Sequence, residues 1–121
     1  MSVTFLHTAD WQLGKPYEYV EDSEKRTLLQ QERFDVIGRM AALVSEHRAE
    51  FVVVAGDLFD TPTASKATVS RACGLIGALG VPVYVIPGNH DHGGAGSIWE
   101  QDFFRREQQE LAPNLNVLRE Q

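Results

Sequence analysis

The sequence predicts an α/β fold with a largely parallel sheet, and three observations lead to this prediction. Short apolar runs rich in β-branched residues alternate with longer segments whose apolar residues recur at helical spacing. Each of the first three apolar runs ends in a turn that carries polar side chains, which is where parallel sheets bind ligands. The 121-residue chain contains no Pro-, Ser- or Gly-rich linker, so we expect one globular unit.

The expected strands occupy residues 3–7, 51–55 and 81–86, and a fourth begins at residue 115. The run at 81–86 is apolar along its whole length and is followed by Pro87 and Gly88. A strand of this composition is typical of parallel sheets that are covered on both faces.

Three helices are expected between these strands. The first runs from about residue 23 to residue 47, because Phe34, Ile37, Ala41 and Val44 have the spacing of one buried face. The second is expected to open at Thr61-Pro62, as N-cap and first helical residue, and to close at Gly80. The third begins at a capping box over residues 97–100 and ends before Pro113.

Composition and charge exclude several classes of protein. No apolar run approaches the roughly 20 residues of a membrane span, and the N-terminus lacks the features of a secretory signal, so we expect a cytoplasmic protein. The single cysteine, Cys73, fits a reducing compartment and is interpreted as a packing residue. The formal charge of −6 argues against a basic surface that wraps nucleic acid, although bound divalent cations would reverse the sign locally.

Asp10, Asp57 and Asn89 each follow an expected strand. Because parallel strands end at the same edge of a sheet, we expect these side chains to converge there. An aspartate after a strand can merely cap a helix, but carboxylate and amide oxygens together favour a divalent metal site. Two metal ions about 3.5–4 Å apart would suit hydrolysis of a phosphate ester.

His90 is the best candidate for an acid in this chemistry, and Asp60 for the carboxylate that orients it. A lone histidine is more often structural, but the position of His90 beside Asn89 favours a catalytic role. The remaining candidates receive structural interpretations: His7 as a core or supporting residue, His47 as a partner of a helix terminus, Trp11 and Trp99 as core, and Arg105-Arg106 as solvated surface, with His92 left open.

Three motifs, in this order and at these spacings, resemble the first three motifs of the calcineurin-like metallophosphoesterase superfamily. They are Asp10-Trp11-Gln12, Gly56-Asp57-Leu58-Phe59-Asp60 and Gly88-Asn89-His90-Asp91. Within that superfamily, the opening His7-Thr8-Ala9-Asp10 and the exact sequence Gly-Asp-Leu-Phe-Asp of the second motif are similar to those of the SbcD-type DNA repair exonucleases.

The resemblance implies a four-layer αββα sandwich, of which residues 1–121 would form only the first, largely parallel βαβαβαβ half. It also implies two divalent metal ions, most typically manganese, and cleavage of DNA phosphodiesters with exonuclease and single-strand endonuclease activities. A homodimer that works with an SbcC-type ATPase is implied as well.

By position, the resemblance makes Asp10 a ligand of the first metal, Asp57 a bridge between the two, and Asn89 a ligand of the second. His90 would act on the scissile phosphate or the leaving group, with Asp60 as its partner. Gln12 departs from the superfamily, which usually has histidine there; an amide oxygen can bind a metal but is neutral and harder than imidazole.

The superfamily's later histidine motifs have no counterpart here, because the last histidine is His92. We therefore expect the chain to be the N-terminal part of a longer nuclease and to hydrolyse little by itself. Two alternatives stay open. One is a related phosphoesterase acting on a cyclic nucleotide, a phosphoprotein or a small phosphate ester; the other is a truncated, non-catalytic interaction module.

Overall fold

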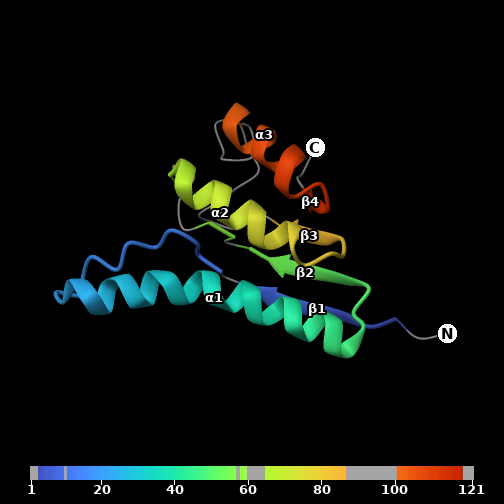
Figure 1. Ribbon diagram of the computed structural model, residues 1–121, viewed down its shortest axis with the longest axis horizontal. Coiled ribbons are helices and arrows are strands. Elements are labelled where there is room, and N and C mark those ends of the chain that lie inside the picture. The colour runs from blue at the N-terminus through green and yellow to red at the C-terminus, as the bar shows by residue number, and fades with distance from the viewer. Residues whose placement is uncertain (1–2, 10, 57, 60–64, 87–100, 119–121) are drawn as a thin grey trace.

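The computed structural model describes residues 3–9, 11–56, 58–59, 65–86 and 101–118. Strands and helices alternate along the chain, and this confirms the predicted element order (Figure 1). The elements are β1 (Phe5–Ala9), α1 (Ser23–His47), β2 (Phe51–Ala55), α2 (Lys66–Gly77), β3 (Val83–Ile86), α3 (Asp102–Leu111) and β4 (Leu115–Val117). None of the helices in the described ranges is long and apolar enough to cross a membrane.

The four strands form one sheet in the order β1-β2-β3-β4, and every neighbouring pair is parallel. The register aligns Ala9 with Ala55 and Ala55 with Ile86, the last residues of β1, β2 and β3. These three strands therefore end at one level, as the sequence predicts for the edge that carries the candidate site.

The three helices lie on the same face of the sheet (Figure 1). Alternate strand residues on that face are buried, among them Val52, Val54, Val83 and Val85, and they pack with Phe34, Ile37, Met40 and Val44 of α1 and with α2. Burying this apolar surface provides the main driving force for the fold.

The opposite face of the sheet is only partly covered by described residues, so the expectation that the third strand is covered on both faces is wrong for this part of the chain. Phe5 is 50% exposed and Ile86 is 47% exposed. The rings of Phe5 and Phe51 stack with centroids 4.9 Å apart, and Tyr84 meets Phe51 edge-on at 5.9 Å. Aromatic contacts between neighbouring strands thus replace burial on this face.

Capping side chains account for where two helices begin. Asp22 precedes α1, and its carboxylate accepts hydrogen bonds from the backbone N–H groups of Glu24 and Lys25. Ser65 precedes α2 in an extended conformation, and its hydroxyl accepts from the N–H of Thr68. Helix α2 therefore begins at Lys66 instead of at Thr61-Pro62, which lie outside the described residues.

The ends of α2 and α3 also differ in part from the prediction. Helix α2 stops at Gly77, and Gly80 lies beyond it with a φ of 70°. The predicted capping box at residues 97–100 lies outside the described residues, and α3 begins at Asp102 after the N-cap Gln101. It ends at Leu111, ahead of Pro113 as predicted.

Helix α3 packs closely on α2. A Cβ atom placed on Gly77 would overlap the carbonyl oxygen of Leu111, so the absence of a side chain at this position allows the two helices to approach. Asn114 then connects the turn after α3 to the last turn of α2 and to the segment that follows it, because its amide nitrogen donates to the carbonyl oxygens of Ile76 at 3.0 Å and Val81 at 2.8 Å.

Candidate functional site

The level ends of β1, β2 and β3 define the edge where the sequence predicts the site. Gly56 follows β2 with a φ of 80°, a value that favours glycine, and its N–H donates to the carbonyl of Ile86 at 2.6 Å. Five of the six predicted site residues follow these strand ends in the sequence and lie outside the described residues: Asp10, Asp57, Asp60, Asn89 and His90.

The turn after β1 lies against the turn after β2. The N–H of Leu13 donates to the carbonyl of Leu58 at 3.0 Å, and Leu13 forms an isolated parallel bridge with Phe59. All three side chains are fully buried, and Phe59 meets Phe104 of α3 edge-on at 6.3 Å. These apolar residues, which are next to predicted site residues in the sequence, are therefore core residues that fix the two turns beside each other.

Gln12 is the predicted site residue that the structure describes. It is half-buried with a left-handed φ of 47°, which is uncommon for a residue other than glycine. Its Oε1 atom lies 3.5 Å from Nζ of Lys15. This oxygen could serve as a metal ligand, but a cation there would have to displace the Lys15 ammonium because the two positive charges repel.

The segment between Gln12 and α1 is held by contacts with α1. Tyr17 is buried with a φ of 55°, and its hydroxyl accepts a 2.6 Å hydrogen bond from Nε of Arg33. Nε2 of Gln30 donates to the carbonyl of Pro16 at 2.9 Å. The ammonium of Lys15 lies 5.3 Å from the centroid of the Tyr17 ring, within the range of a cation–π interaction. Lys15 is therefore positioned from two sides.

A cleft of about 290 Å³ opens beside this segment, between α1 and α2. We call it the α1–α2 cleft, and the charged residues among its described lining are Lys15 and Arg71. Gly14 lies close to α2, because a Cβ atom placed on Gly14 would be 3.3 Å from Cγ2 of Thr68. The φ of Gly14 is 85°, a value that favours glycine. No sequence pattern predicts this cleft, since its two basic residues lie 56 positions apart.

The other candidates divide between core and surface. Trp11 is buried, as predicted, and its indole N–H donates to the hydroxyl of Thr8 at 3.0 Å. His47 lies in the last turn of α1, also as predicted. His7 is exposed on the less covered face of the sheet, so its interpretation as a core residue is wrong here. His92 and Trp99 lie outside the described residues.

Cys73 is fully buried on α2, which confirms its interpretation as a packing residue. Burial raises the pKa of its thiol to about 12, and the negative charge of Glu107 on α3 acts in the same direction. A thiol with so high a pKa is neutral at physiological pH and is a poor nucleophile or metal ligand.

Within the described ranges, no group of three or more histidine, cysteine, aspartate or glutamate side chains could hold a metal ion. Gln12 contributes one neutral oxygen donor at the edge where the predicted ligands follow in the sequence. The donor set of the four predicted metal ligands, Asp10, Gln12, Asp57 and Asn89, consists of oxygen atoms, which suits hard and borderline divalent ions.

Comparison with known proteins gives two findings. The family described as calcineurin-like phosphoesterase matches residues 3–121. The SbcD component of the nuclease SbcCD from Bacillus subtilis (strain 168) is 35% identical to the chain over 91 residues, which cover 72% of this chain. The match covers 22% of that relative's length, so the similarity concerns less than a quarter of it.

Proposed function

Because the chain belongs to the calcineurin-like phosphoesterase family, we propose that it supplies part of the active site of a metal-dependent phosphodiesterase that cleaves DNA. The observation that supports the proposal most strongly is that β1, β2 and β3 end in register at one edge of the sheet. Each of them is followed in the sequence by a family motif. The similarity to a protein named as a nuclease supports a nucleic acid over other phosphate esters, and we propose that this nucleic acid is DNA.

Four residues would hold the metals: Asp10 at the first, Asp57 between the two, Asn89 at the second, and Gln12 in the position where the superfamily usually has histidine. Bound divalent ions, for which we propose manganese, would activate water and neutralise charge on the phosphate. The carboxylates would attract the cations, whereas the neutral amides of Gln12 and Asn89 would orient them without adding charge.

His90 would act on the substrate and not on the metal. An imidazole can donate a proton to the leaving oxygen or hold a phosphoryl oxygen, and a carboxylate such as Asp60 would favour its charged form. Residues 1–121 would be the N-terminal part of a longer nuclease domain. The complete protein would form a homodimer and act with an SbcC-type ATPase in the cytoplasm.

The test of function compares turnover by the complete protein on single-stranded DNA, a cyclic nucleotide and a phosphopeptide. The proposal predicts that DNA is the best of the three. If DNA is the poorest substrate, a related phosphoesterase activity replaces the nuclease.

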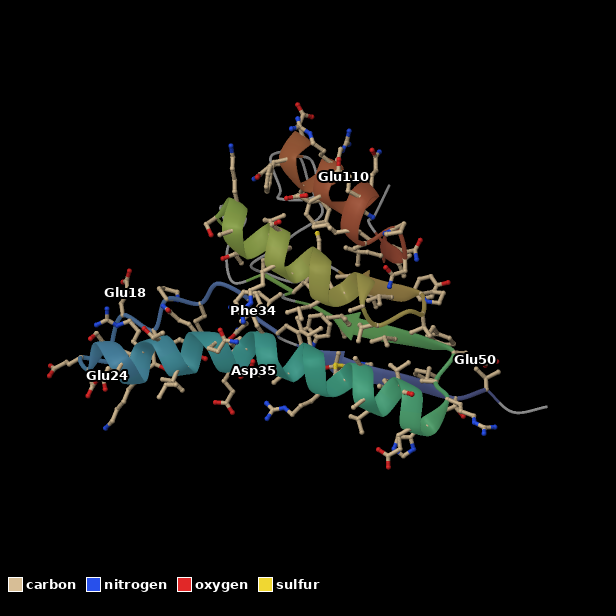
Figure 2. The ribbon with its side chains drawn as sticks, in the orientation of Figure 1. Glu18, Glu24, Phe34, Asp35, Glu50 and Glu110 are labelled. Carbon is tan, nitrogen blue, oxygen red and sulfur yellow. The ribbon has the colours of Figure 1, made fainter. Side chains whose placement is uncertain are left out.

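Metal binding is tested separately by calorimetric titration with manganese. Asp57→Asn should weaken binding, because it removes the negative charge that would bridge two cations. Asp35→Asn is the matched control, since Asp35 is an exposed α1 residue far in sequence from the predicted ligands (Figure 2). Equal binding by both variants would remove Asp57 from the ligand set.

A further inference from the structure

We propose that the α1–α2 cleft binds a backbone phosphate of the DNA strand, at a position other than the phosphate being cleaved. This proposal rests on the proposed function, because it takes DNA to be the substrate. Four features of the cleft support it: its charge, the positioning of its two cations, its size, and its connection to the predicted metal site.

The charge of the cleft differs in sign from that of the chain. The chain carries a formal charge of −6, yet both charged residues in the described part of the cleft lining, Lys15 and Arg71, are basic. Neither of them forms an ion pair with another residue in the part of the chain that the structure describes. Two cations that have no anionic partner among the described residues and that face the same space attract an anion.

Both cations are held in place by neighbouring side chains. The guanidinium of Arg71 lies 4.3 Å from the ring centroid of Phe34, which α1 presents toward α2 (Figure 2). A cation–π contact with a ring occupies no hydrogen-bond acceptor, so the N–H groups of Arg71 can still form a bidentate contact with a phosphate. As long as no metal occupies Gln12, Lys15 is held from two sides by Gln12 and Tyr17, so little side-chain entropy remains to be lost when it binds a ligand in the metal-free protein.

The size and polarity of the cleft suit a phosphate. At about 290 Å³ the cleft is at the lower limit of small-molecule pockets, which fits one phosphate group with part of its sugar. Thr68 lines it as well, and its Oγ1 atom accepts a 2.9 Å hydrogen bond from Ser65. The hydroxyl proton of Thr68 is therefore directed away from Ser65 and can point to an anion.

The cleft is also connected to the predicted metal site. The ammonium of Lys15 lies 3.5 Å from Oε1 of Gln12, which is a predicted metal ligand at the edge of the sheet. The cleft is thus next to that edge, on the side where α1 and α2 meet. A strand whose scissile phosphate lies at the metals would place a neighbouring phosphate within reach of Lys15 and Arg71.

The test measures binding of a fluorescent single-stranded oligonucleotide to the complete protein by polarisation, in EDTA so that metal chemistry does not contribute. Arg71→Gln should weaken binding several-fold and lower the slope of log affinity against log salt by about 0.7, the value for one phosphate contact on a single strand. Arg71→Lys, which keeps the charge, should restore much of the slope.

Arg39→Gln is the matched control, because Arg39 is an exposed α1 residue that does not line the cleft. In the metal-loaded enzyme, Arg71→Gln should also reduce the ratio of kcat/KM on the oligonucleotide to kcat/KM on bis(p-nitrophenyl) phosphate, which has a single phosphate. Arg39→Gln should leave this ratio as it is.

The possible outcomes distinguish a failure of the cleft proposal from a failure of the proposed function. If the unaltered protein cleaves DNA but Arg71→Gln and Arg39→Gln bind the oligonucleotide equally, the cleft proposal is overturned and the proposed function stands. If Arg71→Gln relieves inhibition by inorganic phosphate without changing oligonucleotide binding, the cleft takes free anion and the assignment to a strand is overturned. An unaltered protein that hydrolyses the small ester but not DNA overturns the proposed function itself.

Discussion

Replacing Gly77 by alanine tests the close packing of α3 on α2. The new Cβ would overlap the carbonyl oxygen of Leu111 and lie 3.0 Å from its carbonyl carbon, whereas carbon atoms in ordinary contact are about 3.5–4.0 Å apart. Backbone atoms cannot change rotamer to avoid the clash, so α3 has to move. Gly74→Ala is the matched control, because a Cβ on Gly74, in the interior of the same helix, meets nothing within 4 Å.

Two energies decide the result. Alanine is favoured over glycine in a helix by about 1 kcal/mol, and overpacking costs about 1–3 kcal/mol. We therefore expect Gly74→Ala to gain up to about 1 kcal/mol and Gly77→Ala to lose up to about 2 kcal/mol. Each kcal/mol shifts the melting temperature of a chain this size by on the order of 4 °C.

The assay is thermal and urea unfolding followed by circular dichroism, on the unaltered protein and both variants. A shift of Gly77→Ala in the same direction and by the same amount as Gly74→Ala would show that α3 does not approach α2 at this glycine. The packing described for these helices would then be wrong.

Three further predictions concern the turn after α3, the buried thiol and the active site. Asn114→Asp should lower the free energy of unfolding by about 2–3 kcal/mol in urea titrations, because it removes the donor to two backbone carbonyls, whereas Asn116→Asp at an exposed position should change it little. The pKa of Cys73 is raised from 9.0 to about 12 in the folded protein, so the thiol ionises first in the unfolded chain and the free energy of unfolding should fall as pH rises from about 9 toward 12. In Cys73→Ala this part of the fall should vanish. If the free energy of unfolding has the same slope against pH in both proteins between pH 8.5 and about 10.5, the raised pKa of Cys73 is refuted. His90→Asn in the complete protein should lower turnover while manganese affinity stays nearly unchanged, and a parallel loss of affinity would make His90 a ligand.

The bounds of α1 and β2 follow directly from the sequence because one strong local signal fixes each of them. Four apolar residues at helical spacing predict α1, and β-branched residues followed by Gly56 predict β2; the structure adds the N-cap of α1 at Asp22. The predicted start of α2 is wrong, since two capping signals lie close together. Thr61-Pro62 and Ser65 are both plausible beginnings, and the one at which α2 starts is Ser65.

At the candidate site, the edge of the sheet could be predicted from the sequence, whereas the α1–α2 cleft could not. Strand ends followed by polar residues predict the edge where ligands gather, because parallel strands share a direction and a register. The α1–α2 cleft depends instead on Gly14 approaching Thr68 and on the stacking of Arg71 against Phe34. These contacts join segments far apart in the sequence, and each partner alone looks like an ordinary surface residue.

The two faces of the sheet make different demands on the fold. Helices bury one face, whereas Phe5, Phe51 and Tyr84 form a connected row of aromatic rings on the other. Such a row in contact with water forgoes the roughly 25 cal/mol that each Å² of apolar surface contributes on burial. A second sheet, as in a sandwich with two central sheets, would recover this energy through these side chains. The aromatic row therefore stabilises the pairing of the strands and also provides the surface on which such a sheet would pack. The predicted ligands belong to a different region, because they follow the ends of the strands.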